Sequence, residues 1–127
     1  MLIPILVLAS DPATGATLRR AAEEFGRVVV TTKPAMAIYR AAVHDPLIAI
    51  LDLDVVPPDG RSGLISTLRT RFRTSVVGVG EASTMRDSES LSLTVALVKP
   101  VNVGELMLAV DRLLNERMGK GAETRGT

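Results

Sequence analysis

Short apolar runs alternate with amphipathic segments along almost the whole of this chain of 127 residues. Several of the apolar runs are rich in Val and Ile, and all are short, which is typical of strands buried on both faces of a parallel sheet. The predicted strands are 3–8, 28–31, 47–51, 75–79 and 94–98. The segments between them predict helices over 12–25, 34–44, 64–72 and 85–91, and a last helix from Asn102 or Val103 to about Met118.

This alternation indicates an α/β fold: a three-layer, doubly wound, parallel five-stranded sheet of the flavodoxin-like type, with strand order 2-1-3-4-5. We expect one domain over residues 1–118 and a flexible C-terminal tail over 119–127, which is rich in Gly and charge. Gly26 is predicted to end the first helix. The segment 55–63, dense in Pro, Gly and Asp, is predicted to be a loop in which Asp59-Gly60 forms a turn.

The composition argues against several classes of function. The chain has no cysteine, which excludes disulfides and thiol chemistry, and its net charge of +1 gives no sign of a nucleic-acid-binding stripe. No apolar run approaches the ~20 residues needed to cross a membrane. No Gly-rich phosphate loop follows the first strand, and no Ser/His/Asp set is present. We therefore predict a cytoplasmic protein that is not an enzyme. The competing interpretation, a small flavodoxin-like enzyme or nucleotide-binding protein, predicts a chromophore or a nucleotide-dependent melting temperature.

Polar residues follow four of the predicted strands. Asp52 ends the most apolar stretch of the chain, and the other strand ends carry Ala9-Ser10-Asp11, Gly80-Glu81 and Lys99-Pro100. Open α/β sheets bind their ligands at the carboxyl ends of the strands, so these residues are expected to share one functional edge.

Two of these segments carry a family resemblance. The sequence LIAILDLDVVPPDG resembles the third strand and following loop of the receiver domains of bacterial two-component response regulators, with Asp52 in the phosphoacceptor position and Gly60 eight residues later. The VKP that ends in Pro100 resembles the Lys-Pro of the family's fifth strand, so Lys99 takes the lysine position, and VGELMLAVDRLL is similar to the family's last helix. The resemblance implies the receiver fold and signalling by phosphorylation of an aspartate with Mg²⁺.

The chain departs from the family pattern at functional positions. Ala9 and Ser10 stand where the family has the acidic pair that helps to hold Mg²⁺, and Asp11 comes one residue too late. Gly80 replaces a Thr or Ser, and Ala96 replaces the aromatic switch residue. Mg²⁺ is normally bound through carboxylates, and phosphoryl transfer depends on neutralisation of charge. We therefore expect Mg²⁺ binding, through Asp52 and Asp11, to be absent or weak.

Two functional hypotheses follow. The first is a stand-alone, atypical receiver-like signalling domain that acts through protein–protein contacts, with phosphorylation at Asp52 weak or absent. The alternative is a conventional phospho-accepting response regulator of a two-component phosphorelay, whose metal site uses Asp11 or Asp54. In the first, Asp52 either accepts phosphate weakly or only forms an ion pair with Lys99. Asp54 is either a spare ligand or, as we prefer, points away from Asp52 or caps the loop, while Asp11 is expected to N-cap the first helix.

The last helix predicts an interaction surface. One apolar stripe is assigned to the core: Leu106, Val110 and Leu113. A second, partly exposed stripe predicts an interface, although core packing could absorb Leu114: Met107, Leu114 and Met118. The expected partner is a histidine kinase or an output protein, or a second copy that binds through the face formed by the helix 85–91, the strand 94–98 and the last helix. The only histidine, His44, is expected at the surface. Arg69, Arg71 and Arg73 either form a phosphate or partner patch or, as we prefer, only occupy a helix C-terminus, where cations are favourable.

Overall fold

The computed structural model describes residues 3–126, and the side chains of residues 3–117. All five strands pair in parallel in one sheet of order β2-β1-β3-β4-β5, so the predicted fold class is confirmed. The strands are β1 (Ile3–Leu8), β2 (Gly26–Thr31), β3 (Ile48–Asp52), β4 (Ser75–Gly80) and β5 (Val95–Val98). The helices are α1 (Pro12–Glu23), α2 (Pro34–His44), α3 (Pro58–Thr70), α4 (Ala82–Asp87) and α5 (Val103–Gly126), with a 3-10 turn, η1, at Leu53–Val55.

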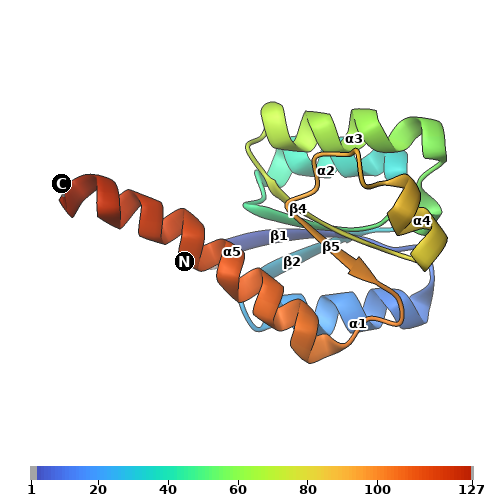
Figure 1. Ribbon diagram of the computed structural model, residues 1–127, viewed down its shortest axis with the longest axis horizontal. Coiled ribbons are helices and arrows are strands. Elements are labelled where there is room, and N and C mark those ends of the chain that lie inside the picture. The colour runs from blue at the N-terminus through green and yellow to red at the C-terminus, as the bar shows by residue number, and fades with distance from the viewer. Residues whose placement is uncertain (1–2, 127) are drawn as a thin grey trace.

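The sheet separates two apolar cores. Helices α1 and α5 cover one face and α2 and α3 cover the other, while the short α4 lies beside the β4–β5 end (Figure 1). Successive residues of β1 contribute to opposite cores, with Ile5 and Val7 on the α1 side and Leu6 and Leu8 on the α2 side. A strand with both faces buried reads as a continuous apolar run, which explains the sequence pattern.

The predicted role of Gly26 is wrong in detail, because this residue begins β2 instead of ending α1. Gly26 does not adopt a left-handed conformation. A Cβ atom at this position would lie 1.9 Å from the carbonyl oxygen of Ile3, its partner in β1. Glycine is therefore required by the close approach of two backbones.

The predicted loop over 55–63 is also wrong, because α3 begins at Pro58. Pro57 occupies the N-cap position and Pro58 the first turn, where proline's fixed φ favours a helix and its missing N–H removes no bond. Asp59 lies in the first turn, where a carboxylate is favourable. The Asp59-Gly60 pair thus starts a helix and does not form a turn between strands.

The last two helices differ from their predicted bounds. Helix α4 spans Ala82–Asp87 and so begins earlier than the predicted 85–91. Helix α5 runs past Met118 to Gly126, and its C-terminal part projects beyond the sheet (Figure 1). The domain boundary at residue 118 and the flexibility of the tail remain predictions.

Candidate functional site

The carboxyl edge of the sheet brings Asp52 and Lys99 together, as expected. Asp52 ends β3 with 1% of its surface exposed, and Lys99 directly follows β5. The Lys99 Nζ atom lies 2.9 Å from Oδ1 and 3.0 Å from Oδ2 of Asp52. Because β4 lies between these two strands, the pair joins strands that are not neighbours.

Asp54 also belongs to this site, and our expectation that it points away from Asp52 or caps the loop is wrong. Its Oδ2 atom lies 2.8 Å from Lys99 Nζ, and its carboxylate accepts hydrogen bonds of 3.0 and 3.3 Å from the backbone N–H of Glu81. It is Asp52 that caps the 3-10 turn, by accepting a 3.1 Å bond from the backbone N–H of Asp54. The turn keeps both carboxylates on one edge, where they share a single ammonium group.

Gly80 makes room for the Asp54 carboxylate. A Cβ atom at residue 80 would lie 3.3 Å from Asp54 Oδ1, 3.1 Å from the methyl group of Thr84 and 3.0 Å from the sulfur of Met85. These side chains therefore fill the space that a larger residue at the end of β4 would occupy. The glycine at residue 80 and the inward orientation of Asp54 are therefore two parts of one packing arrangement.

The contacts within the site shift the pKa values of Asp54 and Lys99. Burial raises the pKa of Asp54, but hydrogen bonds from Lys99, from the Thr84 side chain and from the Glu81 backbone outweigh it, and the pKa is lowered. Burial lowers the pKa of Lys99, but its bonds to Asp54 and Asp52 outweigh this effect and raise it. Both shifts favour the charged forms, so the cluster is stabilised as two carboxylates around one ammonium.

Arg61 holds the loop that carries Asp54. This α3 residue has 8% of its surface exposed, and its Nε atom donates to the carbonyl oxygens of Leu53 (3.2 Å) and Val56 (3.1 Å). A buried carbonyl needs a donor, so the guanidinium fixes both ends of the turn. The sequence analysis missed Arg61, because no local pattern marks an arginine that turns back to the loop before its own helix.

The acidic residue at the first-strand end caps a helix. Asp11 N-caps α1, as predicted, and its carboxylate accepts bonds of 2.9 Å from both the N–H and the hydroxyl of Thr14, which lower its pKa. Ala9 is buried in the core. Within residues 3–117, no group of three or more His, Cys, Asp or Glu side chains is placed to hold a metal ion. The Lys99 ammonium already lies between the two carboxylates of the edge, so a Mg²⁺ ion at this position would have to displace it.

The predicted interface on α5 needs correction. Leu114 has 8% of its surface exposed and packs in the core with Leu106 and Val110, so it is not available to a partner. Met107 is partly buried against the same core, and the side chain of Met118 lies outside the described residues.

On the surface formed by α4, β5 and α5, the exposed apolar residues differ from the predicted ones. Leu108 on α5 and Val98 on β5 are each 52% exposed, and the exposed Ala96 precedes Val98 by two residues. A helix that packs residues 106, 110, 113 and 114 against a sheet turns residue 108 to the opposite side.

Comparison with known proteins identifies the fold. No protein-family model matches the chain, and no curated protein matches it. Among solved structures, a CheY-like response regulator receiver domain protein from Methanospirillum hungatei matches with a TM-score of 0.78 and 18% identity, over 94% of this chain and 99% of that one. The receiver domain of the response regulator AraT from Geobacillus stearothermophilus matches with a TM-score of 0.78 and 17% identity, over 95% and 99%.

A third similar structure is a two-component transcriptional regulator from Clostridium phytofermentans, with a TM-score of 0.78 and 21% identity over 95% of this chain and 98% of that chain. The chain therefore has the receiver fold of response regulators, and the likeness covers almost all of it. In the part of the chain that the structure describes, no helix is both long and apolar enough to cross a membrane.

Proposed function

We propose that this chain is an atypical receiver-like signalling domain that acts through protein–protein contacts, with phosphorylation of Asp52 weak or absent. The observation that carries the proposal is the shared ammonium of Lys99, which lies 2.9 Å from Asp52 and 2.8 Å from Asp54. Two carboxylates and one cation leave the cluster with a net negative charge. An incoming phosphoryl group adds further negative charge, and Lys99 is the only positive side chain in contact with the two carboxylates among the described residues.

The burial of Asp52 supports the same proposal. An attacking carboxylate must be reached in line by the phosphoryl donor, and this side chain is 1% exposed with both oxygens bound by Lys99. Ala9 and Ser10 offer no carboxylate that could bring in a second cation. Signalling then depends on surfaces, and the face around Val98 and Leu108 is where a kinase, an output protein or a second copy would bind.

The test is treatment with acetyl phosphate at millimolar Mg²⁺, followed by intact-mass spectrometry. We expect at most a minor phosphorylated fraction, and none in Asp52→Asn. Ser10→Asp is the matched gain-of-function variant, because it places a carboxylate on the exposed side of the first-strand end. This variant should show a larger phosphorylated fraction when Mg²⁺ is present. Stoichiometric labelling of the unmodified protein would contradict the proposal.

One observation favours the alternative of a conventional phospho-accepting regulator. The Asp54 carboxylate reaches the site, where it is a spare acidic group beside Asp52. If Asp54 serves as the missing metal ligand, Mg²⁺ must displace Lys99 from between the two carboxylates. In that case Asp54→Asn abolishes Mg²⁺-dependent labelling at Asp52, whereas in the proposal above it leaves the small labelled fraction unchanged or larger.

A further inference from the structure

A second surface, far along the chain from the Asp52 site, has unusual composition. Three apolar side chains of α2 lie exposed at helical spacing, with Met36 at 36%, Tyr39 at 58% and Val43 at 57%. The helix packs Ala37, Ala41 and the half-buried Ile38 against the sheet, so the three exposed side chains are not needed for the core. Tyr39 is the only tyrosine of a chain with 2% aromatic residues. This exposed stripe is therefore not explained by folding.

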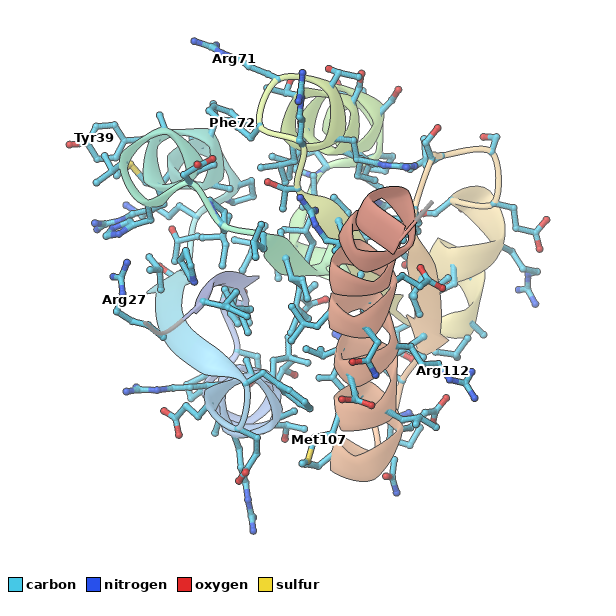
Figure 2. The ribbon with its side chains drawn as sticks, turned by 90° about the vertical axis from the view of Figure 1, so that its left-hand side faces the viewer. Arg27, Tyr39, Arg71, Phe72, Met107 and Arg112 are labelled. Atoms are coloured by element: carbon cyan, nitrogen blue, oxygen red, sulfur yellow. The ribbon has the colours of Figure 1, made fainter. Side chains whose placement is uncertain are left out.

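The stripe is bordered by positive charge. The residues from Gly26 to His44, which make up β2, α2 and their connection, contain three basic residues and no Asp or Glu: Arg27, Lys33 and Arg40. Helix α2 packs beside β2, and Arg27 Nη1 lies 3.4 Å from Nδ1 of His44 at the end of α2. Figure 2 shows Tyr39 and Arg27 at the same edge of the molecule.

These cations have no acidic partners among the described side chains. Neither Arg27, Lys33 nor Arg40 lies within 4.0 Å of a carboxylate there, although Asp52 and Asp54 are both paired. The Nε atom of Arg40 is buried and makes no hydrogen bond within the described part of the chain. A buried guanidinium donor without an acceptor is unfavourable, so the fold itself does not satisfy the hydrogen bonding of Arg40.

From these observations we infer that the exposed face of α2, with the adjoining end of β2, is a docking surface for an acidic, amphipathic segment of a partner protein. Apolar side chains of the segment cover Met36, Tyr39 and Val43, and its carboxylates bind Arg27 and Arg40. Arg40 lies one turn from both Met36 and His44, so the charged row runs directly beside the apolar row. Complementary charge next to an aromatic anchor is the arrangement that gives such surfaces their affinity and specificity.

The inference rests on the proposed function only for the expectation that the partner is a protein. It does not require Asp52 to be phosphorylated, and the α2 surface is separate from the Val98 and Leu108 face. The two can fail independently: labelling of Asp52 tests the first proposal, and binding at α2 tests the second. Asp52→Asn should bind the α2 ligand unchanged.

The experiment is an NMR titration of the full chain, labelled with ¹⁵N, with a short synthetic helical peptide that has Leu on one face and only Glu on the other. A matched peptide with Lys in place of Glu is the control. We expect shifts of amide signals confined to α2 and β2 with the Glu peptide and none with the Lys peptide. Binding should weaken as salt is raised.

Variants test the two halves of the surface separately. Tyr39→Ser should weaken binding of the Glu peptide by about tenfold or more, since it removes the exposed aromatic anchor. The double variant R27E/R40E should abolish that binding and create binding of the Lys peptide. Arg112→Glu on α5 is the control, because it reverses the charge of a surface cation elsewhere on the molecule; this variant should bind unchanged.

Four outcomes overturn the inference. One is equal binding of both peptides, and another is the absence of any shift on α2 with the Glu peptide. A third is a dimer in sedimentation that dissociates in Tyr39→Ser, because the occupant is then a second copy of the chain. The last is an oligonucleotide that gives the same shifts, because the surface then recognises phosphate groups. Unchanged melting temperatures of the variants ensure that loss of binding does not reflect unfolding.

Discussion

The carboxyl edge of the sheet and the α2 surface differ in whether their charged side chains are paired. At the edge, Asp52 and Asp54 are both bound by Lys99, and Asp54 has the Glu81 N–H as well. On the α2 surface, Arg27 of β2 and Arg40 of α2 have no carboxylate within 4.0 Å among the described residues, and exposed apolar side chains of α2 lie on the same surface. A site whose charges are satisfied internally has little left to offer a ligand. A surface whose charges are not satisfied is where binding energy is still available.

The largest expected effect comes from removal of the shared cation. Lys99→Met leaves the buried Asp52 carboxylate without a counter-ion, and we expect the free energy of unfolding to fall by about 3 kcal/mol. Urea denaturation at neutral pH measures this change. Combining Lys99→Met with Asp52→Asn should restore part of the loss, because the uncompensated charge is then removed. A loss below about 1 kcal/mol in the single variant would mean that the cluster behaves like a surface ion pair. The difference in charge pairing between the edge and the α2 surface would then be smaller than the structure indicates.

A smaller effect is expected from pH. The pKa of Asp54 in the folded protein is lowered from its ordinary value of 3.8, so its contribution to stability is present above that value and is lost as pH falls through the folded pKa. The pKa of Lys99 is raised from 10.5, so its contribution is complete below 10.5 and is lost as pH rises through the folded pKa. Asp54→Asn should therefore flatten the acid side of the stability profile. An unchanged acid limb would show that Asp54 is not held as the structure indicates.

The smallest expected effect on stability comes from the α2 surface, to which β2 contributes Arg27. Tyr39→Ser and Arg27→Gln alter exposed side chains, and each should change the free energy of unfolding by no more than about 0.5 kcal/mol. Thermal melting monitored by circular dichroism is sufficient to measure it. A loss above about 1 kcal/mol in either variant would assign these residues to folding and remove the basis for treating the surface as a binding site.

The pairing of residues at the functional edge was largely predictable, because the carboxyl ends of parallel strands all lie at the same edge of the sheet. Asp52 and Lys99 could be brought together from their places after two apolar runs. Asp54 could not be oriented in this way, because its direction depends on the 3-10 turn and on the space left by Gly80. Arg61 was missed because its bonds run backward across the start of α3.

Helix faces show a similar division. The stripe of Leu106, Val110 and Leu113 was correctly assigned to the core by its spacing. Leu114 was assigned to a partly exposed stripe that the core could still absorb, and Leu108 was overlooked. Periodicity defines which residues share a stripe, but not how much of the helix surface the neighbouring elements bury. The residue pattern of α2 likewise did not reveal that small alanines, and not the larger Met36 and Tyr39, face the sheet.

The sequence by itself determined the alternation of strands and helices, the parallel sheet and the edge on which Asp52 and Lys99 meet. These features follow from local periodicity and from the few ways in which βα units can connect. Only the tertiary structure decided that Asp54 shares the Lys99 ammonium and that the cations beside α2 have no carboxylate partner among residues 3–117. Both depend on distances between residues remote in sequence, and on which side chains happen to fill the space between elements, which no local pattern encodes.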